Sequence, residues 1–367
     1  MALIEDGKVN FLIDAQWGST GKGKLAGYLF DRHPNLKYAI SNNMPNAGHT
    51  YTKDGKDFIF KVLPVGAVFP GVVSLLGPHA AIRVDLLEYE MEMVKNETGS
   101  YPEVFIHPLA TIVTTEDITE ESSLVDGIAS TGQGGCAAMT KKIWRRGKAN
   151  LAKDCKEIKH LIADTHRILR TGIARGDAAL AEGSQGFDLS LNCGHSYPYT
   201  TSRDCLVGIM VDNCGVPLKS VGSIIASFRT LPIRVGSTKS TSGPFYDDQT
   251  ELSWKEVSEQ CGYDVEERTT VTKRIRRVFT LSEAQTRKFC EYVRPDYAFL
   301  NFVNYYPEGE KRNKPVEQIG SILSEYGCTL RLLGTGAELE DMEDLHVPSD
   351  ELEQIMFLWE GQPENVL

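Results

Sequence analysis

Short apolar runs alternate along the chain with segments in which apolar residues recur at helical spacing. The run Val9–Asp14 predicts a buried strand, which is followed by a glycine-rich turn and by the start of a helix at residue 25. This alternation is typical of an α/β fold, and we expect a large, mostly parallel central sheet with helices on both faces. The other predicted strands cover residues 73–77, 104–106, 178–182, 223–227, 297–303 and 329–333, and the other predicted helices cover residues 84–95 and 151–169.

The chain has 367 residues and contains no internal repeat and no low-complexity linker. We therefore expect a single domain over residues 1–367, since large α/β enzymes can reach this length around one sheet. The last segment, residues 338–367, is acidic and predicts one or two surface helices.

Composition and charge narrow the class of protein. The net charge is −11, whereas nucleic-acid-binding domains are usually basic, so we expect no direct nucleic-acid partner. No apolar run approaches the ~20 residues of a membrane helix, and the N-terminus lacks the features of a signal peptide. Eight cysteines without a CxxC pair predict reduced thiols in a cytoplasmic protein. Cys193 and His195 are close in sequence, but two candidate ligands do not make a zinc site.

The strongest local pattern is the glycine-rich turn G-S-T-G-K-G-K at residues 18–24. Its glycines let the backbone approach a ligand closely, and the N-terminus of the following helix offers N–H groups to an anion. Leu25 stands where a Walker A loop requires Ser or Thr, so the turn is P-loop-like but not a standard P-loop. The alternative is a glycine turn with solvated lysines; the order of strand, turn and helix favours phosphate binding.

Seven segments together point to one family. Residues 16–24, Q-W-G-S-T-G-K-G-K, resemble the Q-W-G-D-E-G-K-G-K signature of adenylosuccinate synthetases, and residues 46–50 resemble their N-A-G-H-T signature. Further matches follow in the same order at residues 130–134, 145–147, 182–186, 197–202 and 271–277. The chain therefore resembles the adenylosuccinate synthetase family, in fold as well as in motifs, from residue 9 to about residue 340.

The resemblance implies a C–N bond-forming ligase that acts in two steps. A nucleoside triphosphate transfers its γ-phosphoryl group to O6 of a purine mononucleotide, and the amino group of L-aspartate then displaces that phosphate. Phosphoryl transfer works through positioning and charge neutralisation, which Mg²⁺, lysines and turn amides supply. The expected catalytic residues are Ser19, Lys22, His49 and Gln185. His49 would donate a hydrogen bond or proton to O6 as charge develops there.

The resemblance also implies where each ligand binds. The substrate nucleotide is expected at Ser19, Asn46, Thr131, Arg145, Gln185, Thr201 and Arg274. Aspartate is expected at Thr272, Arg274 and Arg276, because the planar guanidinium group of arginine can pair with a carboxylate through two hydrogen bonds. The alternative is that these basic residues form only a solvated surface. The triphosphate is expected at Gly18, Thr20, Gly21, Lys22, Gly23, Lys24, Gly48, Thr50, Arg276, Asn301, Asn304, Gly334, Thr335 and Gly336. Mg²⁺ is expected at Ser19 and at the carbonyl of Gly48. Arg145 matches an arginine that reaches the neighbouring subunit, which implies a homodimer.

Three departures from the family pattern refine this interpretation. Ser19 replaces an aspartate that acts as the base for purine N1, and a serine hydroxyl is a weaker base and ligand. Residues 301–304 are N-F-V-N where the family has T-K-L-D, so Asn304 replaces the aspartate that recognises guanine. Asparagine can pair with adenine, which favours ATP or dATP as the phosphoryl donor. Residues 334–338 are G-T-G-A-E where the family has S-T-G-P-D.

These departures resemble a viral branch of the family, the N6-succino-2-amino-2′-deoxyadenylate synthases. That branch acts on dGMP and serves the synthesis of DNA that contains 2-aminoadenine, which would place the protein in the cytoplasm of a host. Two alternatives stay open: an adenylosuccinate synthetase that acts on IMP, and a nucleotide-binding paralogue without catalysis. Ser19 and Asn304 argue against the first, and retention of His49, Gln185 and the arginines argues against the second.

Overall fold

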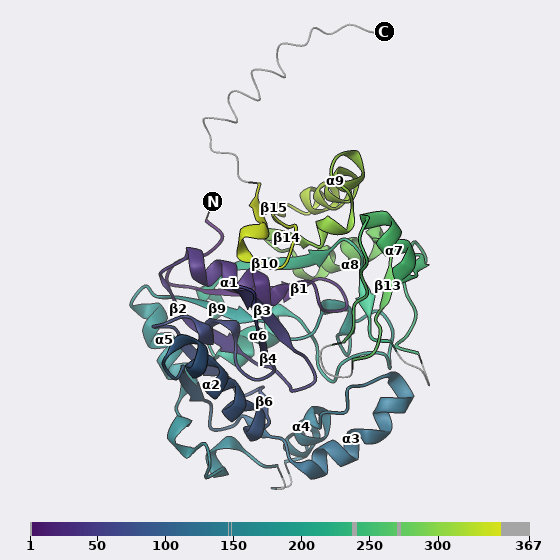
Figure 1. Ribbon diagram of the computed structural model, residues 1–367. Coiled ribbons are helices and arrows are strands. Elements are labelled where there is room, and N and C mark those ends of the chain that lie inside the picture. Colours follow the sequence, from purple (N-terminus) through teal and green to yellow (C-terminus); the bar gives the residue numbers. More distant parts are fainter. Residues whose placement is uncertain (1, 146, 148, 237–240, 270–272, 346–367) are drawn as a thin grey trace, which may run out of the picture.

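The computed structural model describes residues 2–145, 147, 149–236, 241–269 and 273–345. Within these residues the main sheet has nine strands in the order β16-β15-β14-β10-β1-β9-β2-β5-β7 (Figure 1). All neighbouring strands are parallel except β15 and β16, which are antiparallel. The strands are β1 Val9–Asp14, β2 Leu36–Ser41, β5 Val73–Leu76, β7 Glu103–Ile106, β9 Ala178–Glu182, β10 Val221–Arg229, β14 Tyr297–Asn301, β15 Thr329–Gly334 and β16 Met342–Asp344. The predicted α/β fold with a large, mostly parallel sheet is confirmed.

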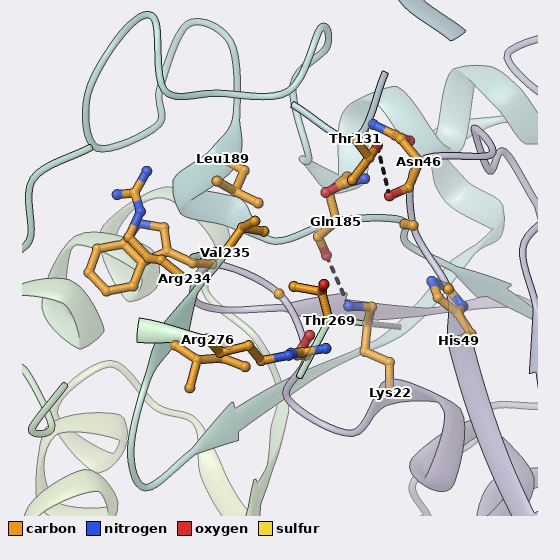
Figure 2. Close-up of a pocket in the computed structure, with 16 residues that line it drawn as sticks. Lys22, Asn46, His49, Thr131, Gln185, Leu189, Arg234, Val235, Thr269 and Arg276 are labelled. Atoms are coloured by element: carbon orange, nitrogen blue, oxygen red, sulfur yellow. Dashed lines mark hydrogen bonds between the residues drawn. The ribbon is translucent and has the colours of Figure 1, made fainter. Parts of the chain in front are cut away.

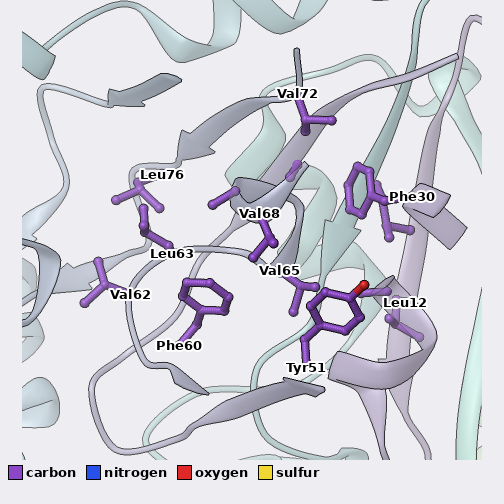
Figure 3. Close-up of a cluster of buried hydrophobic side chains, with 14 of the residues drawn as sticks. Leu12, Phe30, Tyr51, Phe60, Val62, Leu63, Val65, Val68, Val72 and Leu76 are labelled. Carbon is purple, nitrogen blue, oxygen red and sulfur yellow. The ribbon is translucent and has the colours of Figure 1, made fainter. Parts of the chain in front are cut away.

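Both faces of the sheet are covered, as a buried parallel sheet requires. Along β1, Leu12 packs into a cluster with α1 and the hairpin that follows β2 (Figure 3). Phe11 and Ile13 face the opposite side, where α5, α6, α8 and α9 supply the partners. Every residue of β1 is buried, which explains why the strand is mostly apolar, with Asn10 inside it and Asp14 at its end as its polar residues.

The helices are α1 Lys22–Arg32, α2 Val84–Thr98, α3 Thr115–Ile128, α4 Gly135–Ile143, α5 Thr165–Ala174, α6 Val207–Cys214, α7 Trp254–Cys261, α8 Glu283–Val293 and α9 Glu310–Glu325. Figure 1 shows α3 and α4 at the end of the molecule opposite α9. No helix among the described residues is long and apolar enough to cross a membrane.

Three small sheets complete the described part of the chain. The hairpin of β3 (His49–Lys53) and β4 (Lys56–Phe60) packs on α1, and β11 (Ile233–Arg234), β12 (Glu251–Leu252) and β13 (Arg277–Phe279) form a three-stranded sheet. The strands β6 (Ala81–Ile82) and β8 (Thr111–Ile112) pair with each other. The first two small sheets carry residues of the candidate site.

One prediction of secondary structure was wrong, and a second is tested only in part. The helix predicted over residues 151–169 begins only at Thr165, because Asp164 caps its N-terminus by accepting a hydrogen bond from the N–H of Arg167. The preceding apolar residues lie in short 3₁₀ turns and pair with other strands, as Leu151 does with Thr111. The acidic segment from residue 338 forms a 3₁₀ turn and strand β16 as far as the structure describes it, and residues 346–367 lie outside that range.

Candidate active site

The glycine-rich turn is held by the carboxylate at the end of β1. Asp14 is buried, and its Oδ1 accepts hydrogen bonds from the backbone N–H groups of Gln16 (2.9 Å) and Gly18 (3.1 Å). Its Oδ2 accepts from the hydroxyl of Thr20 at 2.6 Å and from the ammonium group of Lys22 at 2.9 Å. Because a buried charge must be paired and hydrogen-bonded, this arrangement fixes both the shape of the turn and the position of Lys22.

Lys22 begins α1 and joins the turn to the loop after β9. Its Nζ donates a second hydrogen bond to the backbone carbonyl of Gln185 at 2.9 Å (Figure 2). Gln185 has a φ of 63°, in the left-handed region that non-glycine residues rarely adopt. Such conformations persist where the surroundings hold them, and they concentrate at functional sites.

Asn301, at the end of β14, lies between the glycine-rich turn and the end of β15. Its Nδ2 donates to the carbonyl of Thr20 at 3.4 Å. A Cβ on Gly21 would lie 1.9 Å from that nitrogen, and a Cβ on Gly334 would lie 2.1 Å from the Oδ1 of the same side chain. Glycine at both positions therefore follows from close packing around Asn301.

A cleft with an empty volume of about 710 Å³ opens at the glycine-rich turn (Figure 2). It adjoins a space of about 640 Å³ on the side of the predicted substrate nucleotide and one of about 580 Å³ on the side of the predicted triphosphate. The predicted residues that line these spaces are Gly18, Ser19, Gly21, Lys22, Gly23, Asn46, Gly48, His49, Thr50, Thr131, Gln185, Thr201 and Arg276. The structure thus brings together residues from six of the seven sequence motifs.

His49 begins β3 and lines the cleft. Its Nδ1 lies 3.5 Å from Oε2 of the buried Glu182, whose Oε1 accepts the N–H of Val65 at 2.9 Å. Its Nε2 is buried and has no hydrogen-bond partner among the described residues. Since buried polar atoms are nearly always paired, this nitrogen is available to a ligand. A protonated ring would donate at both nitrogens, to Glu182 and to that ligand.

The nucleotide side of the cleft carries further buried polar atoms that lack partners within the part of the chain that the structure describes. They are Oδ1 of Asn46, Oγ1 of Thr201 and Nε1 of Trp17. The hydroxyl of Thr131 donates only a long hydrogen bond, 3.5 Å, to the carbonyl of Asn46 (Figure 2). A polar ligand that fills this space would satisfy these groups.

The structure describes only some of the residues that are predicted to bind the substrate aspartate. Thr272 lies outside the described residues. Arg276 lines the cleft; burial lowers the pKa of its guanidinium from the ordinary value, and Glu267 acts in the opposite direction. Arg274 does not line the three spaces, but its buried Nη1 has no partner in the described ranges. Arg145 is exposed outside the cleft, and its contact with a neighbouring subunit stays a prediction.

Several residues that are predicted to bind the triphosphate make hydrogen bonds within the protein instead. The Nζ of Lys24 donates to the carbonyls of Gly336 (2.9 Å) and Asp341 (3.1 Å), and the hydroxyl of Thr335 donates to that same Asp341 carbonyl at 3.1 Å. Burial lowers the pKa of Lys24 to about 8, against the attraction of Asp341. These residues shape the loop after β15, and their contact with a nucleotide stays a prediction.

The two residues expected to recognise the donor base follow β14. The ring of Phe302 lines the triphosphate side of the cleft, and the guanidinium carbon of Arg229 lies 4.0 Å from its centroid. Asn304 does not line these spaces, and its Nδ2 donates to the hydroxyl of Tyr263 at 2.8 Å. Contact between Asn304 and a base therefore also stays a prediction.

Several residues of the cleft were not predicted. Asp14 could have been found, because ligands bind beyond the carboxyl ends of strands in open α/β sheets and Asp14 ends β1. Arg234, whose guanidinium lies 4.8 Å from the ring of Trp17, reaches the site only through tertiary structure. The other additions are Leu189, Ile233, Val235, Glu267 and Thr269.

A family model for adenylosuccinate synthetase matches residues 11–152 and 148–303. The chain therefore belongs to the adenylosuccinate synthetase family, as its motifs predicted. It is a C–N bond-forming ligase that uses a nucleoside triphosphate as phosphoryl donor.

Within the family, the chain is similar to viral members. The N6-succino-2-amino-2′-deoxyadenylate synthase of Vibrio phage phiVC8 is 39% identical over 346 residues, which cover 91% of this chain and 97% of that protein. The adenylosuccinate synthetase of Methanocaldococcus jannaschii is 29% identical over 344 residues, with 91% and 96% covered.

Solved structures agree with this placement. The succinoaminodeoxyadenylate synthetase of cyanophage S-2L, bound to dGMP and to dATP as an energy donor, matches with a TM-score of 0.81 at 30% identity, covering 96% of this chain and 99% of that one. The fully ligated adenylosuccinate synthetase of Plasmodium falciparum matches with a TM-score of 0.77 at 19% identity, covering 92% and 100%, and shows the shared fold alone.

Proposed function

We propose that this ligase joins L-aspartate to C6 of dGMP. The products are N6-succino-2-amino-2′-deoxyadenylate, a nucleoside diphosphate and phosphate, and the reaction passes through a 6-phosphoryl intermediate. The observation that carries the proposal is Ser19, which lines the cleft between its nucleotide and triphosphate sides where the family has an aspartate. The similarity to viral synthases of this product supports the same conclusion.

Ser19 suits guanine for a steric and a polar reason. The 2-amino group of guanine is adjacent to N1, and an aspartate against N1 would fill the space that this group needs. A serine side chain is smaller, and its hydroxyl can accept from one of the two neighbouring donors. A pocket with a hydrogen-bond acceptor for the 2-amino group disfavours IMP. IMP lacks this group, so the acceptor would be left without a partner.

Leu189 and Val235 supply the apolar surface that a deoxyribose requires. Both side chains line the cleft where it adjoins the nucleotide side, between Gln185 and Arg234 (Figure 2). A ribose 2′-hydroxyl placed against them would lose its hydrogen bonds to water without replacement. We assign the preference for dGMP over GMP to these two side chains.

ATP or dATP is the proposed donor, with the triphosphate at the glycine-rich turn. Ser19 and Gly48, whose hydroxyl and carbonyl oxygens are the proposed Mg²⁺ ligands, both line the triphosphate side. This sparse set of oxygens fits Mg²⁺, which usually takes one or two protein ligands and completes its shell with phosphates and water. When bound, the ion would neutralise charge on the transferring phosphoryl group. Lys22 holds its ammonium group beside the same space, and Asp14 prevents that group from moving away.

His49 acts at the purine O6 in this proposal. Its Nε2, which has no partner within the described part of the chain, donates as the oxygen gains negative charge, while Glu182 orients the ring from the other side. Arg276 is assigned to aspartate and to the triphosphate, and Arg145 to the nucleotide phosphate in the partner subunit of a homodimer.

The test is the ratio of kcat/KM for dGMP to that for IMP, measured by phosphate release with aspartate and dATP. We expect dGMP to be preferred by at least about 10²-fold, because one unpaired buried hydrogen-bonding group costs that much or more. GMP should be poorer than dGMP, and Val235→Thr should narrow this difference. Val207→Thr makes the same change on α6 outside the cleft and should leave it unaltered. A preference for IMP would mean that the protein is an adenylosuccinate synthetase with an unusual base.

A further inference from the structure

A buried guanidinium joins two walls of the cleft. Arg229 ends β10 and has an exposed fraction of 0%. Its Nη1 donates to the carbonyl of Ser19 at 3.0 Å, and its guanidinium carbon lies 4.0 Å from the centroid of the Phe302 ring. Ser19 and Phe302 are two positions at which the chain departs from the family pattern. The same cation therefore supports two residues that line the triphosphate side, one of which, Ser19, also lines the central cleft.

Glu267 neutralises this cation. Its carboxylate pairs with Nη1 (3.3 Å) and Nη2 of Arg229, and its Oε1 also accepts the hydroxyl of Tyr305 at 2.8 Å. Burial acts to raise the pKa of Glu267, but Arg229, Arg276 and Tyr305 together outweigh it, and the pKa lies below the ordinary value. The carboxylate is therefore charged at neutral pH, and its two-point contact with the guanidinium fixes its orientation.

The charged carboxylate faces the triphosphate side of the cleft. Among the described residues that line the three spaces, Glu267 is the only one with a carboxylate. A negative charge here repels bound phosphates, so its presence requires a compensating benefit. The benefit that we infer is a fixed position for Arg276. The Nη1 of Arg276 lies 3.9 Å from Oε2 of Glu267, and its Nε donates to the carbonyl of Arg268 at 3.2 Å.

We propose that Glu267 is a positioning residue for Arg276. Clamped by Arg229, the carboxylate holds the Arg276 guanidinium at the edge of the triphosphate space, and the guanidinium gains a ligand anion as its further partner on binding. The long Glu267–Arg276 contact leaves room for that exchange. The inference rests on the proposed function only for the identity of the anions.

A double-mutant cycle on nucleotide binding tests this arrangement. The dissociation constant of dATP is measured by calorimetry for the wild type, Glu267→Gln, Arg276→Met and the double variant. If Glu267 acts through Arg276, each single change raises Kd about 10-fold and the double change raises it no further, because coupled residues are not additive. Independent effects that multiply to about 100-fold, or an unchanged Kd in Glu267→Gln, would overturn the proposal.

Two further variants separate positioning from folding. Glu251→Gln removes the carboxylate that pairs with Arg277, the neighbour of Arg276, and should leave Kd unchanged. Glu267→Gln leaves the Arg229 charge buried without its partner, which can prevent folding. Glu267→Asp keeps that pair's charge but withdraws the carboxylate from Arg276; if the glutamine variant does not fold, the aspartate variant takes its place in the cycle.

The measurement is independent of the proposed acceptor. Binding of a triphosphate needs neither dGMP nor turnover, so a wild type that fails to use dGMP would refute the proposed function and leave this cycle intact. If the wild type binds another triphosphate more tightly than dATP, the cycle is measured with that triphosphate.

Discussion

Replacing His49 by alanine should abolish most turnover while leaving the protein folded. The ring is buried, and its Nε2 has no partner among the described residues, so the 3.5 Å contact to Glu182 is the one side-chain polar contact that the described structure loses. In the reaction, the change removes one donor to an oxygen that gains charge. Such a donor is worth about 2.7–4 kcal/mol, or about 10²–10³-fold in kcat.

The structure also predicts how much kcat should fall in two related variants. Glu182→Gln keeps the shape of the side chain, and a hydrogen bond at the 3.5 Å limit is worth about 1 kcal/mol, so we expect a loss of about 5-fold. His107→Ala removes a histidine that contacts His166 away from the cleft and should leave kcat unchanged.

The assay is release of inorganic phosphate from dATP with dGMP and aspartate, together with calorimetric binding of dATP and circular dichroism. We expect unchanged dATP binding and an unchanged fold in His49→Ala, since the loss is specific to the transition state. Turnover within about 3-fold of the wild type would refute the assignment, because no donor worth several kcal/mol could then have been removed.

Four other outcomes are expected. Ser19→Asp should shift kcat/KM from dGMP toward IMP by about 10-fold or more, because the carboxylate fills the space of the 2-amino group; an unchanged ratio contradicts the role of Ser19. Arg276→Lys should raise the KM for aspartate about 10-fold, since a point charge loses the planar fork; an unchanged KM moves the aspartate site elsewhere. Inactive Arg145→Ala and His49→Ala proteins should regain activity when mixed if the active site is shared, whereas a monomer in light scattering would exclude a dimer. Burial raises the pKa of Glu90 from 4.5 to about 7, so between these values the folded chain holds a proton that the unfolded chain has lost, and the free energy of unfolding falls as pH rises; Glu90→Gln should remove this slope in denaturant titrations.

The central sheet could be predicted from the sequence because its strands are buried on both faces. Val9–Asp14 and Ala178–Glu182 have the predicted bounds, since a buried parallel strand is a compact apolar run. The segment at residues 151–169 misled the prediction because its apolar residues recur at helical spacing although residues 152–154 and 159–161 form short 3₁₀ turns, and the start of α5 depends on the cap at Asp164. The short strands of the small sheets leave little periodicity to detect.

The candidate site divides in a similar way. Motif residues such as Lys22 and His49 lie at the start of a helix and of a strand next to a ligand space, so their local pattern was enough to find them. Arg229 and Glu267 belong to different segments and meet only in the folded chain, and neither has a local pattern that marks it. The apolar lining at Val235 is invisible in sequence for the same reason.

The packing around Asn301 has a consequence for how sequences of this kind can vary. The side chain occupies the space that a Cβ on Gly21 or Gly334 would need, so neither glycine can gain a side chain unless Asn301 shifts or is replaced. Gly21 is constrained further by its φ of 89°, which leaves Gly334 as the freer partner. We therefore expect Gly334 to tolerate alanine only in chains where residue 301 has become smaller, so that substitutions at these two sites arise together over evolution.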